Sequence, residues 1–326
     1  MSKLCYKVIK RHRQVLPRLE KSKNNKKEHL MRKLIFSVGI ALSLSSHAQT
    51  DIWLIDINSD KTVKIESAKN ITNRAGYDNQ PSFSKDHQGL YYTKMLNNNL
   101  GEQQADIFYY HFASNKHSNL TRTIQSSEYS PLETPLKEQQ LSIIKVEPDG
   151  VQRLWTVDTK TGQQQMLNRD IKPVGYHAWG KQSDLTTFVL GEPMTLQYFD
   201  KYPTKNALKV DKNIGRSIRY NSTKDFFSYS KGNEQQQTIW AFNANTKKTT
   251  ELIAMPARSQ YYTWFDDSTL LTASKSKLFT WKLGTDKTWS LFQDVGAICP
   301  EGVSRIAVNS IQTKIALVCN ESAINK

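Results

Sequence analysis

The sequence predicts an all-β fold, a six-bladed β-propeller with four strands in each blade. Three observations indicate it. A short aromatic strand recurs six times along the 326 residues, a hairpin pattern lies between its copies, and the two ends of the sequence hold complementary halves of one repeat. A period of about 40 to 50 residues is typical of repeated β units that bury their apolar faces against one another.

The aromatic strand follows the order apolar, aromatic, any residue, apolar, polar. Aromatic and β-branched residues at these positions favour pleated, buried strands. Residues 158–162 after the third copy carry the Asp and Gly that suit a hairpin turn. The six copies are residues 52–56, 107–111, 154–158, 196–200, 239–243 and 278–282. We expect the tryptophans on these strands to pack between blades: Trp53, Trp155, Trp240 and Trp281.

Between the copies lies an apolar strand, a polar turn and another apolar strand, which is clearest at residues 83–92. Each repeat therefore supplies four strands, the number in a propeller blade. Residues 51–65 carry an aromatic strand with no hairpin before it, whereas residues 303–319 carry a hairpin with no aromatic strand after it. We predict that these two halves pair in one blade and close the ring without an open sheet edge.

Residues 31–48 have the pattern of a secretory signal peptide. Arg32 and Lys33 precede an apolar run of eleven residues, 34–44, and a small-x-small site ends at Ala48. The run is shorter than the roughly 20 residues that span a bilayer. Residues 1–30 form a basic leader, either an extended n-region or sequence upstream of a true start at Met31. We expect cleavage after Ala48, leaving 49–326 as one propeller domain; an uncleaved anchor with a basic tail is the alternative.

The positive charge of the protein is concentrated in this leader. The net charge is +15 for the whole sequence, but residues 1–48 hold twelve Lys and Arg against two Glu. The remaining charge of about +5 is spread along 278 residues without a basic run longer than two. A basic cluster on a folded surface is the electrostatic mark of nucleic-acid binding, so we do not expect a nucleic-acid partner.

Two cysteines remain after signal cleavage, Cys299 and Cys319. A pair in an oxidising compartment is a disulfide candidate, and its short loop would contribute on the order of 3 kcal/mol to stability. Two free buried thiols are the alternative. No Cys-x-x-Cys motif or His/Cys cluster is present, so a structural zinc site is not expected.

One repeat resembles a known family. Ile71-Thr72, then Pro81-Ser-Phe83-Ser84-Lys85-Asp86 and Gly89-Leu-Tyr-Tyr-Thr93, are similar to the TolB-type propeller repeat, which belongs among the WD-type repeats. That repeat has Leu-Thr followed by Pro-x-Trp-Ser-Pro-Asp-Gly. Lys85 stands where the family has Pro, and the later copies lack the Ser-Pro-Asp signature. The resemblance implies a TolB-like six-bladed propeller and, as in that family, either a periplasmic protein-binding module or the propeller of a hydrolase.

The hydrolase arrangement needs a nucleophile elbow of the form Gly-x-Ser-x-Gly, and the sequence has none. We therefore expect a monomeric, non-catalytic module of the bacterial periplasm or secreted space, with no membrane span after cleavage, that recognises a protein, peptide or envelope ligand at the channel mouth. Tyrosines near the predicted inner strands suit such contacts. The candidate binding residues are Tyr77, Asp78, Glu128, Tyr129, Tyr176, His177, Tyr261 and Tyr262.

Two other functions stay open at this stage. Propellers of the lactonase type hold a cation in the central channel with carboxylate and amide oxygens, so a metal-dependent hydrolase is the enzymatic alternative. We expect no cofactor, while Ca²⁺ or another divalent cation in the channel is left open. The third is a structural accessory anchored by an uncleaved leader. The oxygen ligands available to a cation are Asp78, Asn79, Glu128, Glu133, Asp266 and Asp267.

Overall fold

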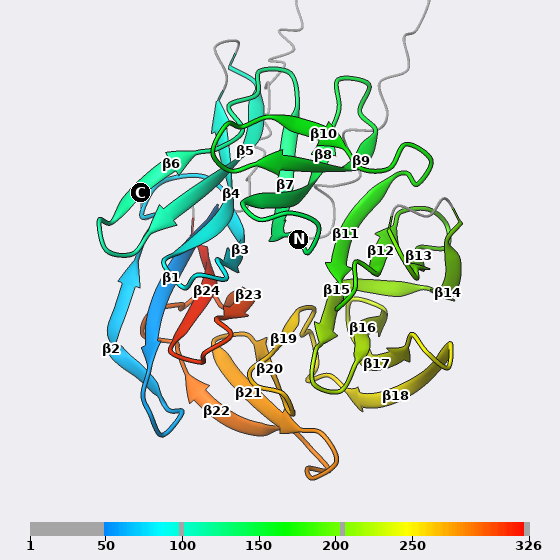
Figure 1. Cartoon of the computed structure of the whole chain (residues 1–326). Coiled ribbons are helices and arrows are strands. Elements are labelled where there is room, and N and C mark those ends of the chain that lie inside the picture. The colour runs from blue at the N-terminus through cyan, green and yellow to red at the C-terminus, as the bar shows by residue number, and fades with distance from the viewer. Residues whose placement is uncertain (1–48, 98–100, 203–205, 323–326) are drawn as a thin grey trace, which may run out of the picture. The chain divides into compact units, whose positions relative to one another are not determined.

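The computed structural model describes residues 49–97, 101–202 and 206–322, which form a ring of six β-sheets around a central axis (Figure 1). Each sheet of this described part has four antiparallel strands, and the described part contains no α-helix. The predicted all-β propeller with six four-stranded blades is therefore confirmed. Every predicted aromatic strand is the third strand of its blade, counted outward from the channel.

Blade 1 combines the blue and red ends of the described part, and blades 2 and 3 follow it around the ring (Figure 1). From the channel outward, blade 1 contains β23 (Val303–Val308), β24 (Lys314–Glu321), β1 (Gln49–Ile57) and β2 (Val63–Asn70). Blade 2 contains β3 (Asp78–Phe83), β4 (Gly89–Asn97), β5 (Gln103–His111) and β6 (Lys116–Asn119). Blade 3 contains β7 (Ser127–Glu133), β8 (Gln140–Val146), β9 (Gln152–Asp158) and β10 (Gln164–Met166).

The other three blades follow in sequence order around the ring. Blade 4 contains β11 (Val174–Trp179), β12 (Leu185–Val189), β13 (Thr195–Phe199) and β14 (Leu208–Lys212). Blade 5 contains β15 (Ile214–Asn221), β16 (Phe226–Gly232), β17 (Gln237–Asn243) and β18 (Lys248–Ala254). Blade 6 contains β19 (Tyr262–Trp264), β20 (Thr269–Ser274), β21 (Lys277–Lys282) and β22 (Ser290–Asp294).

The two ends of the propeller meet in blade 1. β1 pairs with β24 in an antiparallel register that runs without interruption from Gln49 opposite Glu321 to Asp56 opposite Lys314. The outer half of blade 1, β1 and β2, comes from the start of the propeller sequence, and the inner half, β23 and β24, comes from the end of that sequence. The pairing of β1 with β24 joins the two halves. The predicted closure of the ring is confirmed, and it hides the edges that a half-blade would expose.

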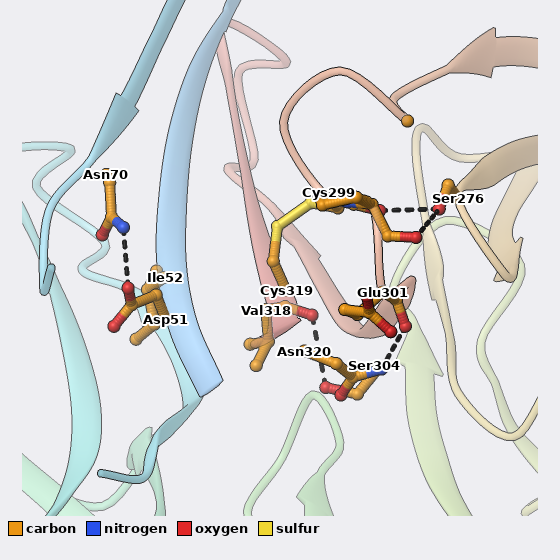
Figure 2. Close-up of a disulfide and its surroundings, with 12 residues drawn as sticks. Asp51, Ile52, Asn70, Ser276, Cys299, Glu301, Ser304, Val318, Cys319 and Asn320 are labelled. Atoms are coloured by element: carbon orange, nitrogen blue, oxygen red, sulfur yellow. Dashed lines mark hydrogen bonds between the residues drawn. A yellow bond between two sulfur atoms is a disulfide. The ribbon is translucent and has the colours of Figure 1, made fainter. Parts of the chain in front are cut away.

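A disulfide lies beside this closure. The sulfur atoms of Cys299 and Cys319 are joined, with 5.1 Å between their Cα atoms (Figure 2). Cys319 lies on β24, and Cys299 lies in the connection from blade 6 to β23. Ser276 donates a hydrogen bond of 2.6 Å to the Cys299 carbonyl and so ties the same connection to blade 6. The link therefore ties the connection from blade 6 to β24, the strand that pairs with β1.

The apolar core is divided among the six junctions between neighbouring blades. The junction of blades 1 and 2, for example, packs Ile52 and Val318 against Leu90 and Tyr92. Burial of each such side chain contributes about 1.5–3 kcal/mol, so every blade is stabilised by both of its neighbours. The four tryptophans of the aromatic strands pack against these clusters as predicted: Trp53, Trp155, Trp240 and Trp281.

The predicted basic leader and signal peptide, residues 1–48, lie outside the described residues. β1 begins at Gln49, the residue predicted to follow the cleavage site. A search of the described residues for a helix long and apolar enough to span a membrane finds none.

Candidate functional site

A cavity of about 60 Å³ opens from the central channel of the propeller. Its walls come from the innermost strands of five blades, β3, β7, β11, β15 and β23. These strands surround the centre of the ring in Figure 1. We call this space the channel cavity.

Three tyrosines from three blades interact with one arginine beside the channel cavity, and a fourth tyrosine interacts with one of the three. Arg305 of β23 donates hydrogen bonds to the hydroxyl oxygens of Tyr176, at 2.8 Å, and Tyr261, at 2.9 Å. Its guanidinium also lies over both rings, 3.8 Å from the Tyr261 centroid and 5.2 Å from that of Tyr176. Tyr77 interacts electrostatically with Arg305 and with Tyr129. These five residues are called the tyrosine–arginine cluster.

Tyr129, Tyr176 and Arg305 lie beside β-bulges of the inner strands, whereas Tyr77 and Tyr261 directly precede β3 and β19. The pairing register shifts between Tyr129 and Leu132 in β7, between Val174 and Tyr176 in β11, and between Val303 and Arg305 in β23. A bulge inserts an extra residue into one strand and re-aims the side chains beside it. Residues that stand at different offsets in the sequence are thereby brought to one place in the channel.

Blade 1 holds Tyr77 in position just before β3. The amide of Thr50 donates to the Gly76 carbonyl at 3.0 Å, and the Thr50 hydroxyl donates to the Asp78 carbonyl at 2.9 Å. The residue that precedes the first inner strand is therefore fixed by β1, the strand that closes the ring.

Blade 5 contributes two further arginines to the wall of the channel cavity. Arg216 and Arg219 both line it, although they are three residues apart on β15. A register shift between Ile214 and Ile218 allows both to face the channel. Gly215 is needed here because a Cβ at this position would collide with the Ser230 hydroxyl.

His177 lines the channel cavity and is buried in a neutral hydrogen-bonded group. Its Nε2 lies 2.6 Å from the Ser142 hydroxyl, which also accepts a hydrogen bond of 2.8 Å from the Trp179 indole and lies 3.1 Å from the Leu132 carbonyl. All three contacts are satisfied together when Nε2–H donates to Ser142 and Ser142 donates to Leu132. Burial lowers the pKa of His177 to about 3. Ser142 is completely buried, so its hydroxyl serves this network and is not an exposed nucleophile.

Burial also keeps two phenols of the cluster protonated. It raises the pKa of Tyr77 and of Tyr261 well above the usual value, and the nearby Arg305 charge opposes this effect only in part. Arginine stays protonated at any physiological pH. At neutral pH Arg305 is therefore a cation beside the neutral hydroxyl groups of Tyr77 and Tyr261.

The structure places the two predicted acidic binding residues away from the channel cavity. Asp78 and Glu128 have completely buried side chains and do not line it. Arg74 pairs with Asp78 at 2.8 Å. Glu128 accepts hydrogen bonds of 2.9 and 3.0 Å from Thr123, and Lys145 lies 3.6 Å from it. Burial raises the pKa of Asp78 to about 6 and that of Glu128 to about 7.

Tyr262 also lies outside the site. Its side chain is fully buried in the apolar cluster between blades 5 and 6, beside Ile239 and Leu270. Of the eight residues predicted to contact a ligand, Tyr176 and His177 line the channel cavity, and Tyr77 and Tyr261 interact with Arg305 beside it. Tyr129 interacts with Tyr77 and packs against the apolar cluster between blades 3 and 4. Asp78, Glu128 and Tyr262 are internal to the blades or their junctions.

The other predicted oxygen ligands for a cation do not converge either. The Glu133 carboxylate accepts from the Lys85 amide at 3.2 Å, and Asp266 accepts from the amides of Ser268 and Thr269 in its own turn. Within the described ranges, no three His, Cys, Asp or Glu side chains form a group that could hold a metal ion. The carboxylates of this set therefore form no such group, and we derive no catalytic step through a metal.

No protein-family model matches the sequence, and no curated protein matches it. Solved structures resemble it in fold. A putative TolB from Agrobacterium tumefaciens superposes with a TM-score of 0.64 at 8% sequence identity, covering 85% of this protein and 99% of the TolB. The fold is TolB-like.

Other TolB-like neighbours carry different functions. One component of a nidogen/laminin complex matches 83% of this protein and 98% of itself, with a TM-score of 0.58 and 9% identity. A gluconolactonase from Xanthomonas campestris superposes on 77% of this protein over 88% of its own length, with a TM-score of 0.57 and 8% sequence identity. One fold thus serves protein binding and catalysis, so the function must be argued from the site.

Proposed function

We propose that this protein is an exported, non-catalytic binding module that recognises a protein or peptide of the cell envelope at the mouth of its propeller channel. The tyrosine–arginine cluster carries the proposal, because four blades contribute an aromatic side chain to one partly buried place. Tyrosine and arginine are the residue types that dominate protein-binding sites, since they combine a large contact area with hydrogen-bonding groups.

The fold neighbours are consistent with this function. The structures named above include TolB and a component of a nidogen/laminin complex, and the latter is by its name a protein assembly. The predicted signal peptide supports export to the periplasm, the compartment that the resemblance to the TolB family also implies.

In-cell photocrosslinking tests the proposal. Tyr129→benzoylphenylalanine places a photoreactive group in the cluster and leaves both Arg305 hydrogen bonds intact. Leu291→benzoylphenylalanine is the matched control, because Leu291 is 57% exposed on the outer strand β22. We expect a discrete crosslinked protein or peptide at position 129 and none at 291.

The affinity of the purified protein for the crosslinked partner then shows how much Tyr129 contributes to binding. Tyr129→Ala should weaken binding of the crosslinked partner by roughly tenfold or more, as is usual for an aromatic residue central to an interface. The same partner crosslinking equally at 291, or full affinity in Tyr129→Ala, would contradict recognition at the channel mouth.

A further inference from the structure

Three arginines share one small space inside the propeller. Arg216, Arg219 and Arg305 all line the channel cavity, and they come from blades 5 and 1. Arg219 and Arg305 interact electrostatically, and this repulsion adds to burial in lowering the pKa of Arg219. The cavity wall therefore concentrates up to three positive charges where water is scarce.

Within the described residues, the charges of Arg219 and Arg305 are not offset by carboxylates. The cavity lining contains no Asp or Glu. None of the ion pairs found in the described ranges joins Arg219 or Arg305 to an acid. Arg305 hydrogen bonds to neutral phenols, and Arg219 donates to the neighbouring Ile218 carbonyl at 2.8 Å. Because a buried charge is costly unless it is paired, an incoming anion would stabilise this arrangement.

A polar atom of the cavity wall lacks a hydrogen-bond partner within the described residues. The Nδ1 atom of His177 is buried and has no hydrogen-bond partner within the described residues, while its Nε2 is engaged by Ser142. Buried polar atoms are almost always satisfied by protein, water or ligand. Because Nε2–H donates to Ser142, Nδ1 is an acceptor, and it would be satisfied by an N–H group of a peptide ligand or by water, not by a carboxylate oxygen.

The size of the cavity limits what can enter. A buried water needs roughly 10–15 Å³ of such volume, so about 60 Å³ admits a few waters or one small polar group, not a folded segment or a sugar ring. A ligand that binds at the mouth would therefore insert only a terminal group or one short side chain.

We propose that the channel cavity binds a single carboxylate of the peptide or protein ligand, held by the guanidinium groups of Arg219 and Arg305, with Arg216 beside them in the cavity wall. The planar guanidinium matches a carboxylate with paired hydrogen bonds. This assignment rests on the proposed function, because the anionic groups of an unmodified peptide are carboxylates. The carboxylate comes either from the C-terminus of the ligand or from an Asp or Glu side chain.

Three short peptides distinguish these sources. Acetyl-Gly-Gly has a free C-terminal carboxylate, acetyl-Gly-Gly-amide has none, and acetyl-Asp-Gly-amide has one only on its side chain. Each is titrated into the purified protein at neutral pH and low salt, with amide chemical shifts as the readout. We expect saturable shifts in residues of β11, β15 and β23 with one or both carboxylate peptides and none with the neutral peptide.

Arginine variants test which residues hold the group. Arg216→Gln and Arg219→Gln should each weaken binding of the responding peptide by roughly tenfold or more, as expected for lost hydrogen bonds to a charged group. Arg169→Gln is the matched control, because Arg169 is exposed on the surface, and it should leave binding unchanged. Thermal unfolding of each variant shows that the fold is retained.

The outcomes separate this inference from the proposed function. Equal binding of the neutral and carboxylate peptides, or unchanged binding in both arginine variants, would overturn the carboxylate site. Saturable binding of inorganic phosphate but of neither carboxylate peptide would overturn it as well. If the partner crosslinked at Tyr129 binds Arg219→Gln as tightly as the wild type, the binding module stands and the carboxylate site does not.

Discussion

Two polar regions of this propeller handle charge in opposite ways. At the junctions around blade 2, buried carboxylates are surrounded by donors from nearby in the sequence. Asp106, for example, accepts from Asn119 at 2.6 Å, from Thr121 at 3.2 Å and from the Thr123 amide at 3.3 Å. In the channel, the charged groups are arginines, and the partners of Arg305 are phenols. A charge satisfied within the protein indicates a structural role, whereas a charge left with neutral partners indicates a place for a ligand.

The acidic network is repeated at the preceding junction. Asp51 accepts from Asn70 at 2.7 Å and from Thr72 at 3.2 Å, and Figure 2 shows the first of these bonds. Both networks use Asn-x-Thr on or just after the outermost strand of the blade and an aspartate on the third strand. The repeated geometry explains why these acids are unavailable to the channel.

The largest effect should come from removing one of these carboxylates. Asp106→Ala leaves the Asn119 amide, the Thr121 hydroxyl and the Thr123 amide without their acceptor, and we expect the free energy of unfolding to fall by about 3 kcal/mol or more. Urea denaturation measures the change. Asp170→Ala, at an exposed position, should change stability by less than about 0.5 kcal/mol; an equal loss in both variants would remove the distinction between structural and surface acids.

Loss of the disulfide between blades 6 and 1 should lower the free energy of unfolding by an amount comparable to that of Asp106→Ala. Cys299 and Cys319 are 20 residues apart, and a loop of this length corresponds to about 3 kcal/mol. Intact mass after alkylation of the unreduced exported protein should show no free thiol, and Cys319→Ala should unfold at lower denaturant concentration. Two alkylations without prior reduction would show that the thiols are free.

A smaller, pH-dependent effect should distinguish Glu128 from surface acids. The pKa of Glu128 is raised by burial from 4.5 to about 7 in the folded protein. Between these values the native state binds more protons than the unfolded state, so the Glu128 contribution to stability falls as pH rises. Glu128→Gln keeps the contact with Thr123 but cannot ionise. Its stability relative to the wild type should rise by on the order of 2 kcal/mol between pH 5 and pH 8.

Glu138→Gln provides the control, because Glu138 is exposed on the turn before β8. Its stability relative to the wild type should change little over the same pH range. Parallel pH profiles for Glu128→Gln and the wild type would mean that Glu128 remains ionised in the folded protein.

The architecture was predictable because each blade buries the same kind of strand. An aromatic third strand that packs at a junction must recur once per blade, so its period predicted six blades. The incomplete repeats at 51–65 and 303–319 predicted that the two ends pair in one blade and close the ring. The convergence of the tyrosines was not predictable from periodicity. A bulge shifts a side chain to the other face of its strand, and the shifts in β7, β11 and β23 differ in sequence position.

The three channel arginines were missed, although the sequence held a usable signal. Arg216 and Arg219 interrupt the otherwise uncharged stretch from Ile214 to Tyr220, and Arg305 stands alone among small and apolar residues of β23. An inner strand of a closed ring packs against neighbouring blades, so a charged side chain on it has the channel as its polar surroundings. The structure places the predicted acidic contacts Asp78 and Glu128 away from the channel cavity, and their partners Arg74 and Thr123 are local in sequence.

Calorimetric titration of the purified protein with acetyl-Gly-Gly, acetyl-Asp-Gly-amide and CaCl₂ in separate runs tests the cationic channel most directly. We expect saturable one-site binding of at least one carboxylate peptide, weakened in Arg219→Gln, and no stoichiometric binding of Ca²⁺. Stoichiometric Ca²⁺ binding together with no response to either peptide would contradict the account and would restore the metal-dependent alternative.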